Sequence, residues 1–229
     1  MKTYITGGVV LLMVAGFWAE GGVLDDFNRV DTDYSVDSGT IGNEWESTGS
    51  VTWTIQNGML SADHNVSGEY AFYNRSEEIC KEGTGGFEIC ADVIGMFGGA
   101  WAGVVFNYQN PDNFYAIRFQ AGTQTYQFVK VVNGRISAAV SRKDASCQFA
   151  VGAAYRIKVI CREPYKISFE ITEAGESTVL NPTTVGTDRA GAFKGGYAGV
   201  YVRSAPGSAR PDALFDNLSA TVLAAQSVE

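Results

Sequence analysis

The chain has 229 residues, of which 45% are hydrophobic, 12% aromatic and 18% charged, a composition typical of a globular domain and not of a disordered chain. The formal net charge of -8 disfavours nucleic acid as a partner, because an acidic surface without a Lys/Arg cluster repels phosphate backbones. It disfavours an anionic polysaccharide too, unless a local basic patch overcomes the repulsion.

The N-terminal residues have the pattern of a secretory signal peptide. Lys2 supplies a positive charge, and residues 5–19 form an apolar run. Such a segment directs export and is then removed. A retained membrane anchor is the alternative, but the run is shorter than the roughly 20 residues of a spanning helix. We therefore expect residues 1–19 to be cleaved and the protein to be secreted, periplasmic or at the cell surface, with no membrane contact beyond the export signal.

After residue 22 the sequence alternates between short strands and turns. Hydrophobic and polar residues follow one another with a period of two, which is typical of half-buried β-strands. Asn57-Gly58 and Asn133-Gly134 each separate two such runs, and Asn-Gly favours the type I′ turn of a tight hairpin. The Asn-Pro-Asp-Asn sequence at residues 110–113 marks a third reversal. The predicted strands are residues 51–55, 59–62, 70–73, 87–94, 102–108, 114–119, 126–132, 136–140, 155–161, 165–171, 199–203 and 214–223.

About a dozen short strands cannot bury their hydrophobic faces in one flat sheet, so they must form two packed layers or a barrel. We predict an all-β fold, a two-sheet antiparallel jelly-roll sandwich that forms one domain over residues 23–223. Residues 224–229 are expected to be a frayed tail. Jelly-roll connectivity brings the first and last strands together, so residues 24–27 are expected beside residues 214–218.

The four cysteines, an even number in a chain expected to be exported, favour disulfides. Alternation puts Cys90 on the polar face of its strand and Cys161 on the apolar face, which disfavours a bridge between them. We expect the pairs Cys80–Cys90 and Cys147–Cys161, each of which closes a local loop. Metal ligation by cysteine is disfavoured, because the chain has no Cys-x-x-Cys pair and only one histidine.

Six motifs follow one another along the chain: residues 25–29 (DDFNR), 53–60 (WTIQNGML), 86–93 (GFEICADV), 103–108 with 112–115 (GVVFNY and DNFY), 155–159 (YRIKV) and 214–218 (LFDNL). In this order they resemble the concanavalin A-like lectin/glucanase superfamily. Within it they are most similar to laminin-G-like and levan-type carbohydrate-binding modules and to the related 3-keto-disaccharide hydrolase domains. The resemblance covers about residues 23–223. It implies a jelly-roll sandwich with one concave face, and often a structural calcium ion.

Aromatic and planar polar side chains, which suit sugar rings and hydroxyl groups, gather in residues 101–118. The resemblance implies that this hairpin carries ligand-facing polar residues, which here are Asn107, Tyr115 and Arg118. Alternation puts Asn107 on one strand face with Trp101, and Trp101 lies beside a glycine-containing loop that we expect to be flexible. Trp101 is therefore a candidate stacking platform. Packing in the core or at its rim is the alternative for Trp101 and Tyr115.

Catalytic carboxylates would be expected as a pair. A retaining glycosidase needs two carboxyl groups about 5–5.5 Å apart. Glu88 and Asp92 share a strand face, but at about 3.3 Å per residue they lie roughly 13 Å apart. His64 is the only histidine, so no Ser-His-Asp or Cys-His arrangement can be argued without it. We predict no catalytic residues and expect a binding domain rather than an enzyme.

A calcium ion is the one cofactor that the residues allow, and none is required. Alternation puts Asp216 on the inner face of the last strand with Leu214 and Leu218, and a buried carboxylate needs a partner. Asp26, near the opposite end of the domain, could share with Asp216 a calcium ion, which takes about 6–8 oxygen ligands. The alternative is that Asp216 accepts backbone N–H groups in a turn.

The predicted function is that of a secreted, non-catalytic domain that binds a carbohydrate or another surface, with a glycan or cell-surface polysaccharide as its partner. One alternative is a glycoside-active enzyme of the 3-keto-disaccharide hydrolase type, by analogy of fold. The other is a structural envelope protein that binds protein partners and has no sugar site.

Overall fold

The computed structural model describes residues 22–25, 27, 45–48, 52–63, 69–74, 85–143, 147–163, 166–176, 180, 184–187, 193, 195–203 and 212–223. Within these residues every regular element is a β-strand, fifteen in all, as the alternation predicts. No helix in this part of the chain is long and apolar enough to span a membrane. The predicted signal peptide and the predicted tail lie outside the described residues.

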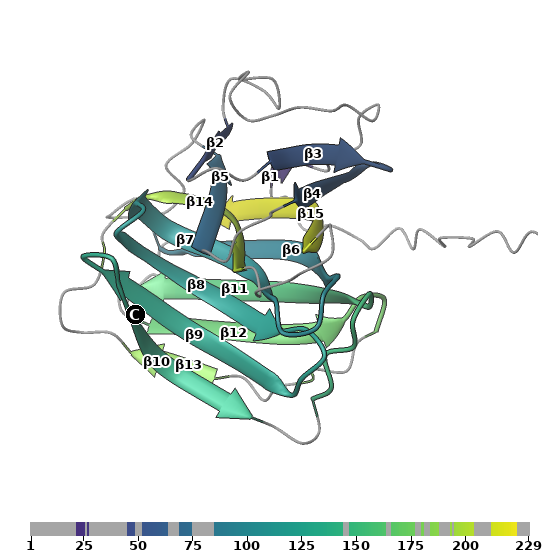
Figure 1. Ribbon diagram of the computed structural model, residues 1–229. Helices are drawn as coiled ribbons and strands as arrows, with labels where there is room; N and C mark the ends of the chain where they lie inside the picture. The colour runs from purple at the N-terminus through teal and green to yellow at the C-terminus, as the bar shows by residue number, and fades with distance from the viewer. Residues whose placement is uncertain are drawn as a thin grey trace, which may run out of the picture.

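The strands form two antiparallel sheets that pack face to face, which confirms the predicted jelly-roll sandwich. Figure 1 shows β7, β8 and β9 in one layer and β6, β11 and β12 in the layer behind it. The first sheet has eight strands: β13 (Thr184–Thr187), β12 (Lys166–Glu173), β11 (Ala154–Glu163), β6 (Phe87–Gly95), β15 (Ala213–Val222), β4 (Met59–Asp63) and β3 (Thr52–Gln56) in spatial order, with β1 (Gly22–Asp25) paired to β15. The second sheet has seven: β10 (Arg135–Lys143), β9 (Thr125–Val132), β8 (Asn113–Gln120), β7 (Trp101–Asn110), β14 (Tyr197–Arg203), β5 (Glu69–Asn74) and β2 (Trp45–Ser47).

The first and last strands lie side by side, as predicted. Val23 of β1 pairs with Ser219 of β15, and Asp25 pairs with Leu218. The pairing reaches residues 218–220 of β15 instead of residues 214–218, because β4 pairs with β15 at residues 213–215. The two strands β1 and β4 therefore share one edge of β15.

Asp25 connects this strand junction to the second sheet. Its buried carboxylate accepts hydrogen bonds from the backbone N–H of Phe27 (2.8 Å) and from Nε1 of Trp45 in β2 (3.0 Å). The ring centres of Phe27 and Trp45 are 5.7 Å apart, and both side chains are buried. Trp45 therefore packs at the edge of the core.

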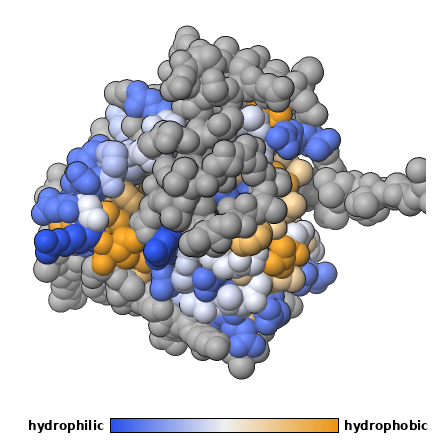
Figure 2. All heavy atoms as spheres, viewed as in Figure 1, coloured by the Kyte–Doolittle hydropathy of each residue, from blue (hydrophilic) through white to orange (hydrophobic). Residues whose placement is uncertain are grey.

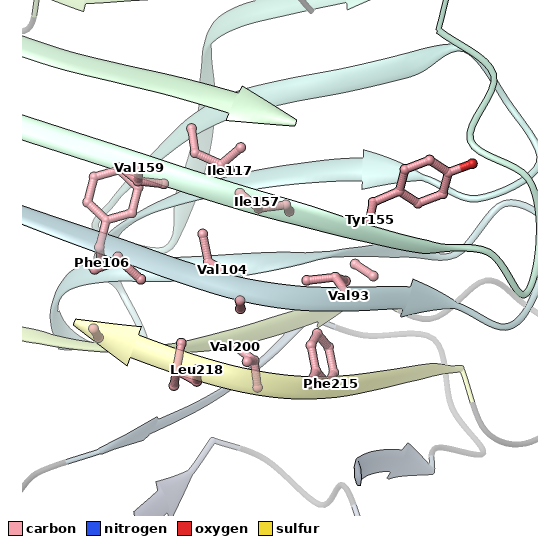
Figure 3. Close-up of a cluster of buried hydrophobic side chains, with 14 of the residues drawn as sticks. Val93, Val104, Phe106, Ile117, Tyr155, Ile157, Val159, Val200, Phe215 and Leu218 are labelled. Atoms are coloured by element: carbon pink, nitrogen blue, oxygen red, sulfur yellow. The ribbon is translucent and has the colours of Figure 1, made fainter. Parts of the chain in front are cut away.

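Alternating apolar side chains fill the space between the sheets. In β6 every second residue is buried and the residues between them are half-buried, a pattern that results from the period of two. Figure 3 shows side chains from both sheets meeting in one cluster, among them Val93 of β6, Val104 of β7, Ile117 of β8 and Ile157 of β11. Burial of these side chains supplies the main stabilising free energy of the fold.

The two Asn-Gly turns form as predicted. Asn57 and Gly58 have φ values of 53° and 72°, and Asn133 and Gly134 have φ values of 49° and 70°. Positive φ at both central residues is the requirement of a type I′ turn, which glycine meets without strain and asparagine with little. These turns connect β3 to β4 and β9 to β10.

The predicted disulfides are wrong for the described cysteines. Cys90 is a free thiol on the polar face of β6, where its Sγ lies 3.8 Å from a carboxylate oxygen of Glu88. Cys80 lies outside the described residues. Within the described part of the chain no disulfide joins Cys147 to Cys161, and the Cys147 thiol donates a hydrogen bond to the backbone carbonyl of Leu180. The predicted faces of Cys90 and Cys161 are confirmed, since Cys161 is buried in the core and Cys90 is half-buried.

Candidate functional site

The outer face of the second sheet, which points away from the first sheet, carries the predicted residues Trp101 and Arg118. Gly103 of β7 lies opposite Arg118 of β8 on one side and opposite Tyr201 of β14 on the other. Arg118 in turn lies opposite Gln127 of β9. Trp101 precedes Gly103 by two residues and so faces the same side of β7, whose intervening residues point into the core. We call Trp101, Arg118, Gln127 and Tyr201 the outer-face cluster.

Arg118 is the centre of the outer-face cluster. It is 3% exposed, and its guanidinium donates hydrogen bonds to Oε1 of Gln127 from Nε (3.0 Å) and Nη2 (2.8 Å). Its Nη1 donates to the hydroxyl of Tyr201 (2.5 Å). The ζ carbon lies 4.6 Å from the centre of the Trp101 ring and 5.4 Å from that of the Tyr201 ring. Because an aromatic face attracts a cation, the guanidinium stabilises the position of the Trp101 indole while hydrogen bonds hold the guanidinium itself.

Gly103 leaves the space in which this cluster forms. A Cβ atom at this position would lie 1.9 Å from the carbonyl oxygen of Ile117 and 2.7 Å from the Cα of Arg118. Only glycine allows β7 to approach β8 so closely at this point. Because Gly103 has no side chain, Arg118 and Tyr201 can meet above it from the two neighbouring strands.

The loop between β6 and β7, which the sequence suggests is flexible, is hydrogen-bonded to the end of β8 and to the residue after it. The N–H of Gly99 donates to the carbonyl of Ala121 (2.9 Å), and Nε2 of Gln120 donates to the carbonyl of Gly99 (3.0 Å). Gln120 of β8 and Arg203 of β14 lie opposite Trp101 on its two sides. The half-buried Trp101 therefore stands on a fixed strand end between two polar residues.

Asn107 does not share the face of Trp101, and this part of the prediction is wrong. Its φ is 46°, and the register of β7 with β8 shifts next to it. This β-bulge interrupts the alternation, so Tyr108 takes the next position on the outer face. The side chain of Asn107 is 5% exposed and donates from Nδ2 to the carbonyl of Phe193 (2.8 Å). Among the described residues, no group donates a hydrogen bond to Oδ1 of Asn107.

Tyr115 is a core residue, as the alternative interpretation had it. It is 1% exposed, and its ring centre lies 5.5 Å from that of Phe106 and 5.1 Å from that of Phe193. The backbone N–H of Phe193 donates to its hydroxyl (3.2 Å). The four predicted ligand-binding residues therefore fall into two pairs: Trp101 and Arg118 meet on the outer face, whereas Asn107 and Tyr115 meet at Phe193.

The carboxylates Glu88 and Asp92 lie on the outer face of the first sheet, and each forms an ion pair with a residue of β11. Nζ of Lys158 is 3.1 Å from Glu88, and Nε of Arg156 is 2.8 Å from Asp92. The hydrogen bond to Asp92 raises the pKa of Arg156 above its ordinary value. Burial acts to lower the pKa of Lys158, but the hydrogen bond and the charge of Glu88 outweigh it, so this pKa is raised as well. Both carboxylates are therefore engaged in holding β6 to β11.

Asp216, which alternation predicted to face the core, lies on the outer face of the first sheet. Phe215 is fully buried and Asp216 only half-buried. A bulge at Asn217, with φ of 51° and a register shift against β6, returns Leu218 to the core. The prediction was wrong because it assumed unbroken alternation. Oδ1 of Asp216 accepts the backbone N–H of Asn217 (2.7 Å), the turn contact that was the alternative.

The described residues do not form a calcium site by themselves. Within the described part of the chain, no group of three or more His, Cys, Asp and Glu side chains is placed to hold a metal ion. Asp26, the predicted second ligand, lies outside the described residues. One half-buried carboxylate that already accepts a backbone hydrogen bond does not supply the oxygen shell that calcium requires.

Residues 86–220, more than half of the chain, match the family described as the beta xylosidase C-terminal concanavalin A-like domain. The chain belongs to this family. The match extends from β6 into β15 and so includes the whole outer-face cluster. It confirms the superfamily that the six sequence motifs resemble. No curated protein sequence matches the chain.

Solved structures share the fold of this family member. The carbohydrate-binding module CBM66 from Bacillus subtilis has a TM-score of 0.60 at 17% identity and covers 78% of this chain and 95% of its own. The GH43 protein BlXynB (K247S mutant) from Bacillus licheniformis has a TM-score of 0.60 at 14% identity, over 92% of this chain and 41% of its own. The exoplasmic/lumenal domain of VIP36 has a TM-score of 0.54 at 12% identity, over 90% of this chain and 92% of its own. At these identities the likeness shows the fold alone, and this chain spans less than half of the GH43 protein.

Gln127 and Tyr201, which hold Arg118, are not among the residues predicted from the sequence. The signal for Gln127 is present in this family member, because alternation in β9 puts it on the face opposite the buried Tyr126 and Phe128. The pairing of β8 with β9 then brings it beside Arg118. Tyr201 has no such local signal, since β14 follows β7 by almost a hundred residues and its register depends on the tertiary fold.

On the described part of the surface, exposed aliphatic side chains are few. The large hydrophobic residues that the described surface exposes are Val132, Ile136, Val151 and Val222, at 36–52%. Figure 2 shows hydrophobic surface in separate patches between hydrophilic residues on the viewed face. Single exposed aliphatic residues are usual on protein surfaces, so these give no argument for a protein-docking face.

Proposed function

We propose that this family member is a secreted, non-catalytic carbohydrate-binding domain whose ligand stacks a sugar ring on Trp101. The observation that carries the proposal is the outer-face cluster, in which a half-buried indole at a strand end rests on a buried and hydrogen-bonded guanidinium. The similarity to the carbohydrate-binding module CBM66 supports it at the level of fold.

The chemistry of the cluster suits a sugar. One face of a pyranose ring presents C–H groups, which pack on a flat aromatic surface, whereas its rim presents hydroxyl groups, which need donors and acceptors. Gln120 and Arg203, the residues opposite Trp101 in the sheet, are the polar groups best placed for those hydroxyls. Because strands rather than loops fix this arrangement, little ordering is needed when a ligand binds.

Glycan binding is tested by titrating the purified protein with xylohexaose, xyloglucan oligosaccharides and levan fragments in a calorimeter. We expect saturable binding to at least one of them. Trp101→Ala should weaken it at least tenfold, which corresponds to about 1.4 kcal/mol or more. Val151→Ala is the matched control, because Val151 is 49% exposed and lies outside the cluster. Absence of binding to a broad glycan array, or full binding by Trp101→Ala, would contradict the proposal.

The non-catalytic part of the proposal is supported by the ion pairs of Glu88 and Asp92, which engage the carboxylates that a hydrolytic role would use. Incubation with glycosides and 3-keto-glycosides should release no sugar. Product formation that disappears in Glu88→Gln or Asp92→Asn would instead support the enzyme of the 3-keto-disaccharide hydrolase type.

Secretion and calcium binding are further parts of the proposal. Secretion is supported by the apolar run at residues 5–19, and N-terminal sequencing of exported protein should find a start near residue 20. Calcium at Asp26 and Asp216 stays a prediction, supported by the superfamily resemblance. A rise in melting temperature with calcium that chelation reverses and Asp216→Asn abolishes would support it.

A further inference from the structure

We propose that Arg118, held by Gln127 and Tyr201, is a positioning residue that fixes the Trp101 indole as a one-sided platform for an uncharged sugar ring. This inference deepens the proposed function and depends on it for the identity of the ligand. The sequence predicts Arg118 as a direct ligand contact. The structure gives it another role, because a side chain that is 3% exposed has little surface with which to touch a ligand.

The platform is one-sided because the guanidinium covers part of the indole. The ζ carbon of Arg118 lies 4.6 Å from the centre of the Trp101 ring, a stacking distance, so this face of the ring is occupied. A ligand can therefore stack only on the opposite face, as a single ring and not as a ring inserted between two aromatic side chains. Tyr201, the other aromatic residue of the cluster, lies 5.4 Å from the same guanidinium and is buried.

The position of the guanidinium is fixed on two sides. Gln127 of β9 accepts two of its hydrogen bonds and Tyr201 of β14 accepts one, so two strands on opposite sides of Arg118 hold this one group. A tryptophan side chain that is ordered before binding loses less conformational freedom when the ligand arrives. The hydrogen bonds of Arg118 thus act on affinity through the orientation of Trp101.

The ligand is expected to be uncharged for two reasons. The positive charge of Arg118 is buried and is used within the cluster, so it is not presented to a carboxylate in solution. The net charge of -8 repels an acidic polysaccharide as it approaches. Arg203 is an exposed cation beside Trp101, but one charge is small against the net charge of -8, so a neutral oligosaccharide should bind more tightly than one of equal length that carries uronic acid.

The positioning role is tested first without any sugar, by fluorine NMR of protein labelled with fluorotryptophan. The chain has four tryptophans, and Trp101→Phe identifies the Trp101 resonance. We expect Arg118→Met to shift and broaden this resonance, Arg118→Lys to do so less because it keeps a cation near the ring, and Gln127→Met to resemble Arg118→Met. Arg156→Met is the matched control, because it removes an equally forked side chain from the other sheet.

The second measurement is the affinity for xylohexaose, or for whichever neutral oligosaccharide the wild-type protein binds. Arg118→Met should lose about fivefold to tenfold, within the range that a cation–π contact supports, and Arg156→Met should lose none. An unchanged Trp101 resonance and unchanged affinity in both Arg118→Met and Gln127→Met would overturn the positioning role. Tighter binding of a uronic acid oligosaccharide would overturn the uncharged ligand. If the resonance responds as expected but no sugar binds, the proposed function fails and the positioning of Trp101 by Arg118 stands.

Discussion

Arg156 of β11 binds Asp92 of β6 through two hydrogen bonds of equal length, 2.8 Å from Nε and 2.8 Å from Nη2. The two residues are direct partners in the strand register. Nδ2 of Asn217 in β15 donates a third hydrogen bond to the same carboxylate at 3.0 Å. Asp92 therefore links three neighbouring strands at the centre of the first sheet, next to the bulge in the last strand.

Replacing Arg156 should weaken the fold more than replacing its neighbour Lys158. The fork-shaped pair with Asp92 has good geometry, and the Asp92 side chain is only 13% exposed, so its charge would be left without the guanidinium. Arg156→Met should cost about 1–2 kcal/mol of the free energy of unfolding, measured by chemical denaturation. Lys158→Met breaks a more exposed pair and should cost no more than about 0.5 kcal/mol. Equal losses in the two variants would show that the forked geometry adds nothing.

Adding one methyl group at Gly103 should disrupt the outer-face cluster. In Gly103→Ala the new Cβ would overlap the backbone carbonyl of Ile117, and β7 and β8 would have to separate. We expect a loss of about 3 kcal/mol in unfolding free energy, together with loss of glycan binding. Gly98→Ala is the control, since its nearest neighbour would be a Val151 methyl at 4.0 Å and its φ is ordinary. A Gly103→Ala protein as stable as Gly98→Ala would show that the strands adjust without cost.

Strands and tight turns could be predicted because their signals are local. Period-two alternation marks β6, β11 and β12, and an Asn-Gly pair marks each type I′ turn. Bulges could not be predicted in this way. Asn107 and Asn217 both adopt positive φ within a strand, and a lone asparagine in a strand carries no sign that it will do so. Each bulge changes the phase of the alternation between its two sides. Asn107 is itself the bulge residue of β7, and the inner face of Leu218, which follows the bulge at Asn217, does not extend back to Asp216, which precedes it.

The candidate site was half predictable from the hairpin alone. Alternation puts Trp101 and Arg118 on one face of the hairpin. The turn at residues 111–112 would pair Arg118 with Val105, and the register shift between residues 106 and 110 places it opposite Gly103 instead. The same alternation already separates Tyr115 from Arg118, since residues three apart on a strand point to opposite faces. Tyr201 could not be found, because its position depends on how β14 docks on β7 after a long connection.

The thiol of Cys90 should be slow to react at neutral pH. Burial raises its pKa from the ordinary 9.0 to about 11, and the charge of Glu88 acts in the same direction. Alkylation by iodoacetamide, followed by peptide mass spectrometry, should be slow at about pH 8 and accelerate towards pH 11, because the thiolate is the reactive form. Fast labelling of Cys90 at about pH 8 would contradict the raised pKa.

The raised pKa of Cys90 also predicts that the protein loses stability at alkaline pH. A raised pKa means that the folded protein holds this proton more tightly than the unfolded chain does. The stabilisation is fully present below pH 9.0 and is lost as the pH rises through about 11. Between these values the wild-type protein should lose more unfolding free energy than Cys90→Ala, measured by chemical denaturation at each pH. Parallel losses in the two proteins would show that Cys90 does not titrate differently in the folded state.

Asn107 should prove to be a residue of the fold and not of the ligand site. Asn107→Ala should cost about 2 kcal/mol of unfolding free energy, of which about 1 kcal/mol comes from positive φ and about 1 kcal/mol from the lost hydrogen bond to Phe193. Asn107→Gly accepts the same φ without strain, so it should cost only the roughly 1 kcal/mol of the lost hydrogen bond. Chemical denaturation measures both.

The affinity of Asn107→Gly for sugar separates the two roles of this residue. Its side chain is 5% exposed and meets Phe193, away from the outer-face cluster, so we expect the affinity for xylohexaose, or for whichever oligosaccharide binds, to stay within about twofold of wild type. The amide oxygen Oδ1, which no described group reaches, is the one atom that could give another result. A tenfold loss of affinity with only the small loss of stability would show that Oδ1 accepts a hydrogen bond from the ligand, as the sequence suggested, and would place a second contact beside Phe193.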